Sequence, residues 1–153
     1  MYSKDEVATL KQEFWTTFGQ YMALETSSAG LRVNWVNYKT GIKHLYFKME
    51  ADGKKARIGI EMNHTDLSMQ SLLFEQFQEF KSMLRDHLDE DWTWELHTTD
   101  DYGKAISRIS TAVYGLSIFK REDWPALISF LKPRLLALDN FWNDAQDSFG
   151  LFT

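Results

Sequence analysis

Three side chains that could bind a metal ion lie in one short stretch of the chain. His44 begins this stretch, and Glu61 and His64 close it. If residues 44–63 form a hairpin, the ends of its two arms meet and bring these side chains together. Imidazole and carboxylate groups are suitable zinc ligands. However, no HxH or HxxxH spacing accompanies them, so we favour a surface His–Glu hydrogen bond and expect no metal and no cofactor.

Aromatic and basic side chains interleave along the same stretch, at Tyr38, Tyr46, Lys48, Lys55 and Arg57. Single-stranded nucleic acid binds such surfaces, because bases stack on the rings while the cations neutralise phosphates. The alternative is a sheet face that is solvated or covered by a protein partner, because a half-buried strand needs polar side chains at every second position. The formal net charge of −5 does not support nucleic acid, so we favour the alternative.

Two runs of alternating residues position these groups and are joined at Asp52-Gly53. Alternation with a period of two predicts half-buried strands, and Asp-Gly is a favoured two-residue turn. The sequence therefore predicts a hairpin over residues 44–63 with one apolar face to be covered. The polar face is expected to pair Glu50 with Lys55, Lys48 with Arg57, Tyr46 with Gly59, and His44 with Glu61. In the third of these pairs, the ring would cover bare glycine backbone.

Helical and strand periodicities predict the remaining elements. Ser3 and Glu6 form a capping box at the start of the chain, and Pro133 is expected to kink or divide the last helix. Asp123 is the expected cap of that helix. The predicted elements are a helix from Ser3 to about Tyr21 or Leu24, a strand at 31–36, the hairpin at 44–63, a helix at 68–88, strands at 92–97 and 105–114, and the helix from Asp123.

This order of elements predicts an α+β fold. A mostly antiparallel sheet of about five strands should carry amphipathic helices on one face, in the order α-β-β-β-α-β-β-α. A chain of 153 residues is expected to form a single domain over residues 1–153.

Composition limits the setting in which the protein works. The chain has no cysteine, so disulfide and thiolate chemistry are excluded. Its charged start does not resemble a secretory signal, and no apolar run approaches the roughly 18 residues of a membrane span. We expect a cytoplasmic protein with no membrane partner.

Charge is distributed unevenly along the chain. Residues 31–60 carry seven basic against two acidic side chains, and residues 64–103 carry ten acidic against two basic. Opposite surfaces of this kind are compatible with a protein partner or with self-association as a homodimer. The simpler interpretation, which we favour, is two solvated faces, because exposed charges contribute little.

Several segments resemble a bacterial family known as domain of unknown function 4268. The resemblance is carried by IGIEMN at 58–63, LLFEQFQEFKSMLRDHL at 72–88, WTWEL at 92–96, ISRIS at 106–110 and DWPALISFL at 123–131. It implies no catalytic residues. Members of the family occur alone or attached to nuclease-like domains, which implies an association with nucleic-acid-processing or defence systems.

The expected order of helix, three strands, helix and strand is also similar to the core of PD-(D/E)XK nucleases. There, acids bind a divalent metal and a lysine orients the attacking water. The corresponding segment here is Glu61-Met62-Asn63, with Glu50 or Asp52 as the earlier acid. Asn63 cannot replace the lysine, and the earlier acids are expected at the opposite end of the hairpin. This resemblance therefore implies a degenerate or inactive nuclease-like domain.

The sequence therefore favours a non-enzymatic binding or protein-interaction module without catalytic residues over the nuclease-like alternative. A small-molecule enzyme would instead show a deep pocket with a perturbed acid or histidine. The predicted binding residues are His44, Tyr46, Lys48, Lys55, Arg57 and Glu61, with Glu61 and His64 as weak metal candidates.

Overall fold

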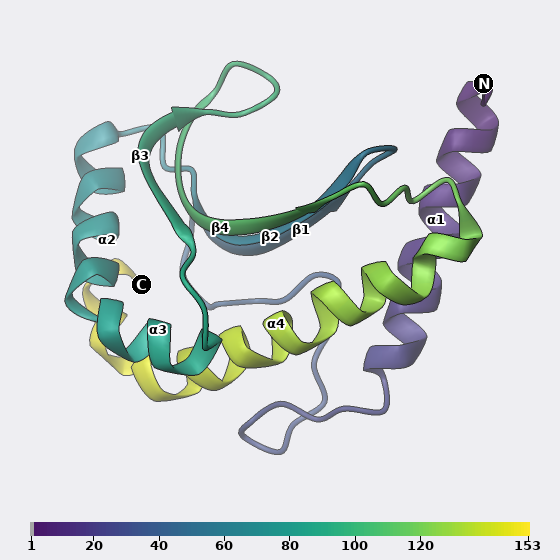
Figure 1. Cartoon of the computed structure of the whole chain (residues 1–153). Coiled ribbons are helices and arrows are strands. Elements are labelled where there is room, and N and C mark those ends of the chain that lie inside the picture. Colours follow the sequence, from purple (N-terminus) through teal and green to yellow (C-terminus); the bar gives the residue numbers. More distant parts are fainter. Residues whose placement is uncertain (1) are drawn as a thin grey trace.

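A computed structural model describes residues 2–153 and confirms the predicted α+β fold (Figure 1). Four antiparallel strands form one sheet in the order β1-β2-β4-β3, so β1 and β3 are the edges. Helices α2, α3 and α4 lie on one side of this sheet, and α1 lies beside it near the turn of the first hairpin. The elements are α1 (Lys4–Met22), β1 (Leu45–Ala51), β2 (Lys55–Met62), α2 (Leu67–Glu79), α3 (Lys81–Leu88), β3 (Thr93–Thr99), β4 (Ala105–Tyr114) and α4 (Trp124–Ala145), with short 3₁₀ helices at Arg121–Asp123 and Gln146–Phe152.

The apolar face of the sheet forms the core together with the helices. Ile58 and Ile60 of β2 are fully buried beneath α4 and α2. Phe77 of α2 stacks on Trp142 of α4, and Trp142 meets Phe47 of β1 edge-on, with ring centroids 5.8 Å apart. Burial of these large side chains is the main favourable contribution to folding.

The predicted hairpin is confirmed, but its register is not. Glu50 pairs with Arg57 and Lys48 with Gly59, a shift of two residues from the expected pairs. The turn is longer than Asp-Gly because the Asp52 carboxylate accepts the N–H groups of Lys54 and Lys55. A shift of two residues keeps every side chain on its predicted face. The same shift also removes the other expected pairings on the polar face, including the cover of Gly59 by Tyr46, which pairs with Glu61 instead.

The strand predicted at 31–36 does not form. Residues 23–44 contain no helix or strand, and single side chains anchor them to the core. Trp35 is buried and donates its indole N–H to the carbonyl of Glu25, whereas Leu31 is largely exposed. The alternating pattern of this segment therefore reflects loop anchors, and β1 remains an edge strand.

The helix predicted at 68–88 is divided at Phe80, which separates α2 from α3. The amide of Phe80 bonds to the carbonyl of Phe77 in a tighter turn, and the Phe80 ring packs near Phe149. The break changes the direction of the chain so that α3 packs beside α4. Breaks of this kind depend on tertiary packing and leave no signal in the apolar spacing.

The last helix also differs from expectation at two positions. Pro133 does not divide it, since α4 runs without interruption from Trp124 to Ala145. The Asp123 side chain does not cap α4, because its carboxylate accepts the N–H of Ser117 instead, at 2.9 Å. The predicted capping box of Ser3 and Glu6 is confirmed, and the Asp66 side chain caps α2.

Candidate functional site

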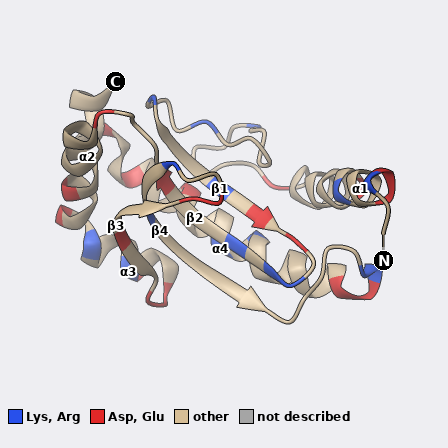
Figure 2. Ribbon diagram, turned by 90° about the horizontal axis from the view of Figure 1, so that it is seen from above, with Lys and Arg blue, Asp and Glu red and all other residues tan. Residues whose placement is uncertain are grey.

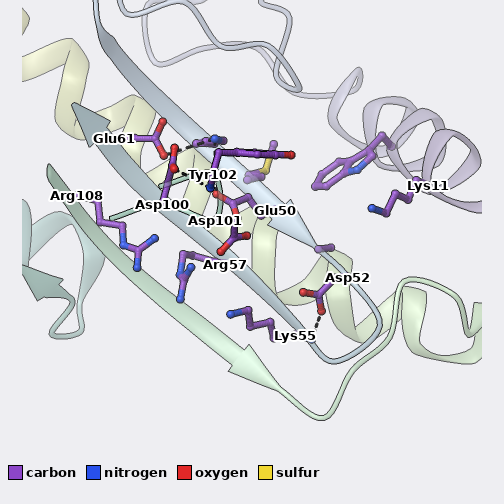
Figure 3. Close-up of a pocket in the computed structure, with 14 residues that line it drawn as sticks. Lys11, Glu50, Asp52, Lys55, Arg57, Glu61, Asp100, Asp101, Tyr102 and Arg108 are labelled. Atoms are coloured by element: carbon purple, nitrogen blue, oxygen red, sulfur yellow. Dashed lines mark hydrogen bonds and ion pairs between the residues drawn. The ribbon is translucent and has the colours of Figure 1, made fainter. Parts of the chain in front are cut away.

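The polar face of the sheet is hollowed into a cavity of about 470 Å³ (Figure 3). Strands β1 and β2 form its base, α1 borders one side, and the loop between β3 and β4 reaches over the other. Figure 2 shows this face from above, with positions of charged residues coloured along β1 and β2, and with α4 behind the sheet. The lining residues are Lys11, Trp15, Lys48, Met49, Glu50, Ala51, Asp52, Lys55, Arg57, Glu61, Asp100, Asp101, Tyr102 and Arg108.

Glu61 is the most buried acid of the cavity, with 8 % of its surface exposed. Burial raises the pKa of its carboxyl, and the ammonium of Lys48 opposes this effect from 3.5 Å. The same ammonium lies 3.8 Å from the carboxylate of Glu50. Lys48 therefore acts as the counter-ion of two carboxylates and occupies the space between them.

A second ion pair closes the end of the cavity near β3. The guanidinium of Arg108 on β4 donates to the carboxylate of Glu95 on β3 at 2.8 Å. This hydrogen bond lowers the pKa of Glu95. Both residues point to the polar side because Glu61, Arg108 and Glu95 are neighbours across three strands.

The loop between β3 and β4 is held over the cavity by Asp100. The carboxylate of Asp100 accepts the N–H groups of Tyr102 and Lys104, each at 2.9 Å. The N–H of Lys104 is the main cause that lowers the pKa of Asp100. This local bonding presents the Tyr102 side chain, which is 95 % exposed, above the charged groups (Figure 3).

Three cations of the cavity have no acidic partner. Within the described part of the chain, no carboxylate lies within 4 Å of the charged groups of Lys11, Lys55 or Arg57. Lys55 and Arg57 are half-buried. The nearby Asp52 carboxylate caps the turn. Burial alone would raise its pKa, but the N–H groups that it accepts and the more distant positive charges of Lys55 and Lys11 lower it overall. The unpaired cations are therefore available to an anionic group of a ligand.

Strands β2 and β4 approach each other closely on the polar side of the sheet. Gly59 of β2 pairs with Ser110 of β4, and Arg57 pairs with Ala112. A Cβ added at Gly59 would lie 2.6 Å from the Cβ of Ser110. Glycine is therefore needed at this position by the close approach of the two strands.

Four of the predicted binding residues meet in the cavity, namely Lys48, Lys55, Arg57 and Glu61. Tyr46 lies on the same face and lines an adjacent cavity. Tyr38 lines this adjacent cavity as well, from the loop before β1, and its ring stacks on Phe47 at 5.1 Å between centroids. Its hydroxyl donates to the Asp139 carboxylate at 2.5 Å, so burial and this bond raise its pKa.

The predicted metal ligands are brought together only in part. The rings of His44 and His64 lie 4.4 Å apart, and Nδ1 of His64 accepts the N–H of Asp66. Among residues 2–153, no group of three or more His, Asp or Glu side chains is arranged to hold a metal ion.

The sequence did not reveal the upper and outer walls of the cavity. Lys11, Asp101 and Tyr102 come from α1 and from the β3–β4 loop, far along the chain from the hairpin. Two signals were present. Arg108 is the one charged residue in the strand-like segment at 105–114, and Tyr102 is a bulky aromatic in a turn that should be polar.

A serine–histidine pair outside the cavity has the distance of a nucleophile and its base. Oγ of Ser71 lies 3.1 Å from Nε2 of His97. However, Nε2 also lies 3.2 Å from the carbonyl of Leu67, which can only accept. A proton on Nε2 that is donated to this carbonyl would leave no lone pair to accept the proton of Ser71, so these contacts do not define a nucleophile and its base.

The chain is thus an antiparallel α+β domain with a charged hollow on the open face of its sheet. The chain belongs to the family described as Domain of unknown function (DUF4268), whose model matches residues 10–146. No curated protein and no solved structure matches the chain.

The similarity to PD-(D/E)XK nucleases finds no support. It required three strands before the second long helix, and the structure has two. Met62 of the Glu61-Met62-Asn63 segment points into the core. Glu50 does not lie apart from Glu61 as expected, because both carboxylates contact Lys48. Along residues 2–153, no helix is both long enough and apolar enough for a bilayer crossing.

Proposed function

We propose that the chain is a non-enzymatic binding module that recognises a protein partner through the polar face of its sheet. The observation that carries this proposal is the cavity in which Lys55 and Arg57 are half-buried without an acidic partner. Partial burial weakens the hydration of a cation, and an anionic group of a partner would compensate for the loss. We infer that carboxylates of the partner pair with these two side chains.

Exposed tyrosines around the same face support a protein as the ligand. Tyr46 is 47 % exposed, Tyr102 95 % and Tyr114 69 %. All three lie on or above the polar face, because Tyr46 pairs with Glu61 and Tyr114 with Lys55. Tyrosine and arginine are enriched among residues that dominate protein–protein binding, since they combine large contact area with hydrogen bonding.

The proposal is tested by photo-crosslinking in cells that express the protein. A benzophenone amino acid at position 102 faces the cavity, and the same group at Leu72, exposed on α2, reports on the helical side. We expect a discrete adduct from position 102 and none of that mass from position 72.

Paired substitutions make the test specific to the cations. The double variant Lys55→Ala/Arg57→Ala should reduce the adduct about tenfold or more, since a charge-assisted hydrogen bond contributes roughly 1.5–3 kcal/mol. The control Lys81→Ala removes an exposed cation from α3 and should leave the yield unchanged. An adduct that is insensitive to the double variant, or absent from position 102, contradicts the proposal. An adduct with a second copy of the chain would identify the partner as the chain itself, in a homodimer.

A degenerate nuclease-like domain is the second candidate. One observation favours it, because Glu50, Glu61 and Lys48 bring together two carboxylates and a lysine. In such a site the acids would hold a divalent metal, and a lysine would orient water. Here the ammonium occupies the space between the carboxylates, which argues for an inactive site. Mg²⁺-dependent cleavage of DNA that is lost in Glu61→Gln would show an active nuclease and would contradict both the inactive site and the non-enzymatic binding module.

A further inference from the structure

The outer edge of β1 has free main-chain hydrogen-bonding groups. Asp52 donates its N–H to Lys55, and Asn63 donates to His44, so the even-numbered residues of this arm face β2. In an antiparallel pair the intervening residues direct their N–H and C=O groups to the opposite side. The outward-facing residues are Leu45, Phe47, Met49 and Ala51.

Almost none of these outward groups has a partner. The carbonyl of Leu45 accepts the hydroxyl of Thr40 at 3.0 Å. For Phe47, Met49 and Ala51, residues 2–153 supply no hydrogen bond on this side. Natural proteins normally cover or blunt such an edge, because it is a template for another strand.

A groove runs along this edge and is bordered by other parts of the chain. The charged cavity continues past β1 to Lys11 and Trp15 of α1 (Figure 3). A second cavity of about 600 Å³ lies between Tyr46–Met49 and the loop at Val36–Lys39. Trp15, Lys48, Met49 and Glu61 line both cavities, so the two form one channel along β1.

We propose that this groove binds an extended segment of a partner protein, which adds to the sheet as a fifth strand beside β1. This inference rests on the proposed function and specifies how the partner is held. Only an extended main chain offers donors and acceptors at the spacing that β1 leaves free, and added strands are a recurring mode of peptide recognition. A second copy of this chain fits poorly, because its own β1 edge is recessed between the same two walls.

The walls of the groove define the side chains of the segment. Trp15, Val36 and Phe47 offer apolar contacts along the groove. The groove is also lined by basic side chains, because Lys11 and Lys39 have no carboxylate within 4 Å among residues 2–153 and Lys55 lies at the turn end. Side chains of a strand alternate between its faces. The segment should therefore alternate apolar and acidic residues.

The test begins with a phage-displayed library of random nine-residue peptides selected against the full chain. We expect enrichment of sequences that alternate apolar and acidic residues. One enriched peptide is then synthesised in two isomers, N-methylated at its odd or at its even residues. Strand addition predicts that one isomer binds at least tenfold more weakly while the other binds like the parent, because only alternate amides face β1. Failure to enrich any peptide, or equal binding of both isomers, overturns the inference.

A substitution on the edge provides a second readout. Met49→Pro removes an outward N–H without removing a bond to β2, so it should bind the parent peptide about tenfold more weakly than Met49→Ala, which truncates the same groove-lining side chain but keeps the N–H. If Met49→Pro does not fold, the comparison of the two isomers still decides. Lys55→Ala/Arg57→Ala separates the two proposals. If the two isomers bind differently and this variant binds the parent peptide normally, strand addition is retained and the cation-based site is rejected. If the two isomers bind equally and this variant binds the parent peptide more weakly, the cation-based site is retained and strand addition is rejected.

Discussion

The two faces of the sheet have the same four strands but opposite chemistry. On one face Ile58, Ile60 and Phe77 are fully buried among helices. On the other, Lys55 and Arg57 lie in a cavity without acidic partners. The difference shows that stability comes mainly from the covered face, where apolar area is removed from water. The open face is expected to contribute less to folding, because its charged groups stay close to water.

The largest expected effect on stability comes from removing a buried side chain that packs against the covered face. Phe77→Ala removes a fully buried ring that stacks among Phe141, Trp142 and Phe149. We expect the free energy of unfolding to fall by about 3–5 kcal/mol. The matched change on the open face, Tyr46→Ala, should cost no more than about 0.5 kcal/mol. Urea unfolding of both variants measures the contrast, and similar losses would remove the distinction between the faces.

A smaller effect tests the tightly packed centre of the open face. In Gly59→Ala the added Cβ would lie 2.6 Å from the Cβ of Ser110 and 2.8 Å from the carbonyl oxygen of Ile109. The strands must move apart, which should cost about 1–3 kcal/mol. Gly150→Ala serves as the control, since nothing lies within 4 Å of its added Cβ. If thermal unfolding shows that Gly59→Ala is as stable as the native chain, β2 and β4 can move apart without a cost in stability.

The smallest effect concerns pH. Burial raises the pKa of Glu61, so in the interval between its ordinary and raised pKa the folded chain binds more protons than the unfolded chain. Its contribution to stability therefore falls as the pH rises through that interval. Glu61→Gln, which cannot ionise, should gain stability relative to the native chain from pH 4 to pH 7. Urea titrations at several pH values would measure this difference, and the opposite slope would show that Lys48 outweighs burial.

The division between the two faces could be predicted from sequence because it depends on local alternation. The register could not, since a two-residue turn and the longer turn around Asp52 place the same side chains on each face. Selection of the longer turn depends on the hydrogen bonds that the Asp52 carboxylate accepts from Lys54 and Lys55. Side-chain patterning does not encode these bonds.

The candidate site could be predicted only where it lies within the hairpin. Lys48, Lys55, Arg57 and Glu61 follow from the alternation. Lys11 and Tyr102 are added by distant segments, and their approach depends on packing across the whole chain. The open β1 edge also escaped prediction, because the segment at 31–36 has the alternation of a strand but does not pair with β1.

Lysine labelling tests the central claim, that the open face binds a partner, most directly. The chain is treated with an amine-reactive acylating reagent in purified form and inside cells, and modified lysines are quantified by mass spectrometry. The account predicts that Lys55 is protected in cells relative to the purified chain, whereas Lys81, exposed on α3, is modified equally in both. Equal modification of Lys55 in the two preparations would contradict a partner on the open face.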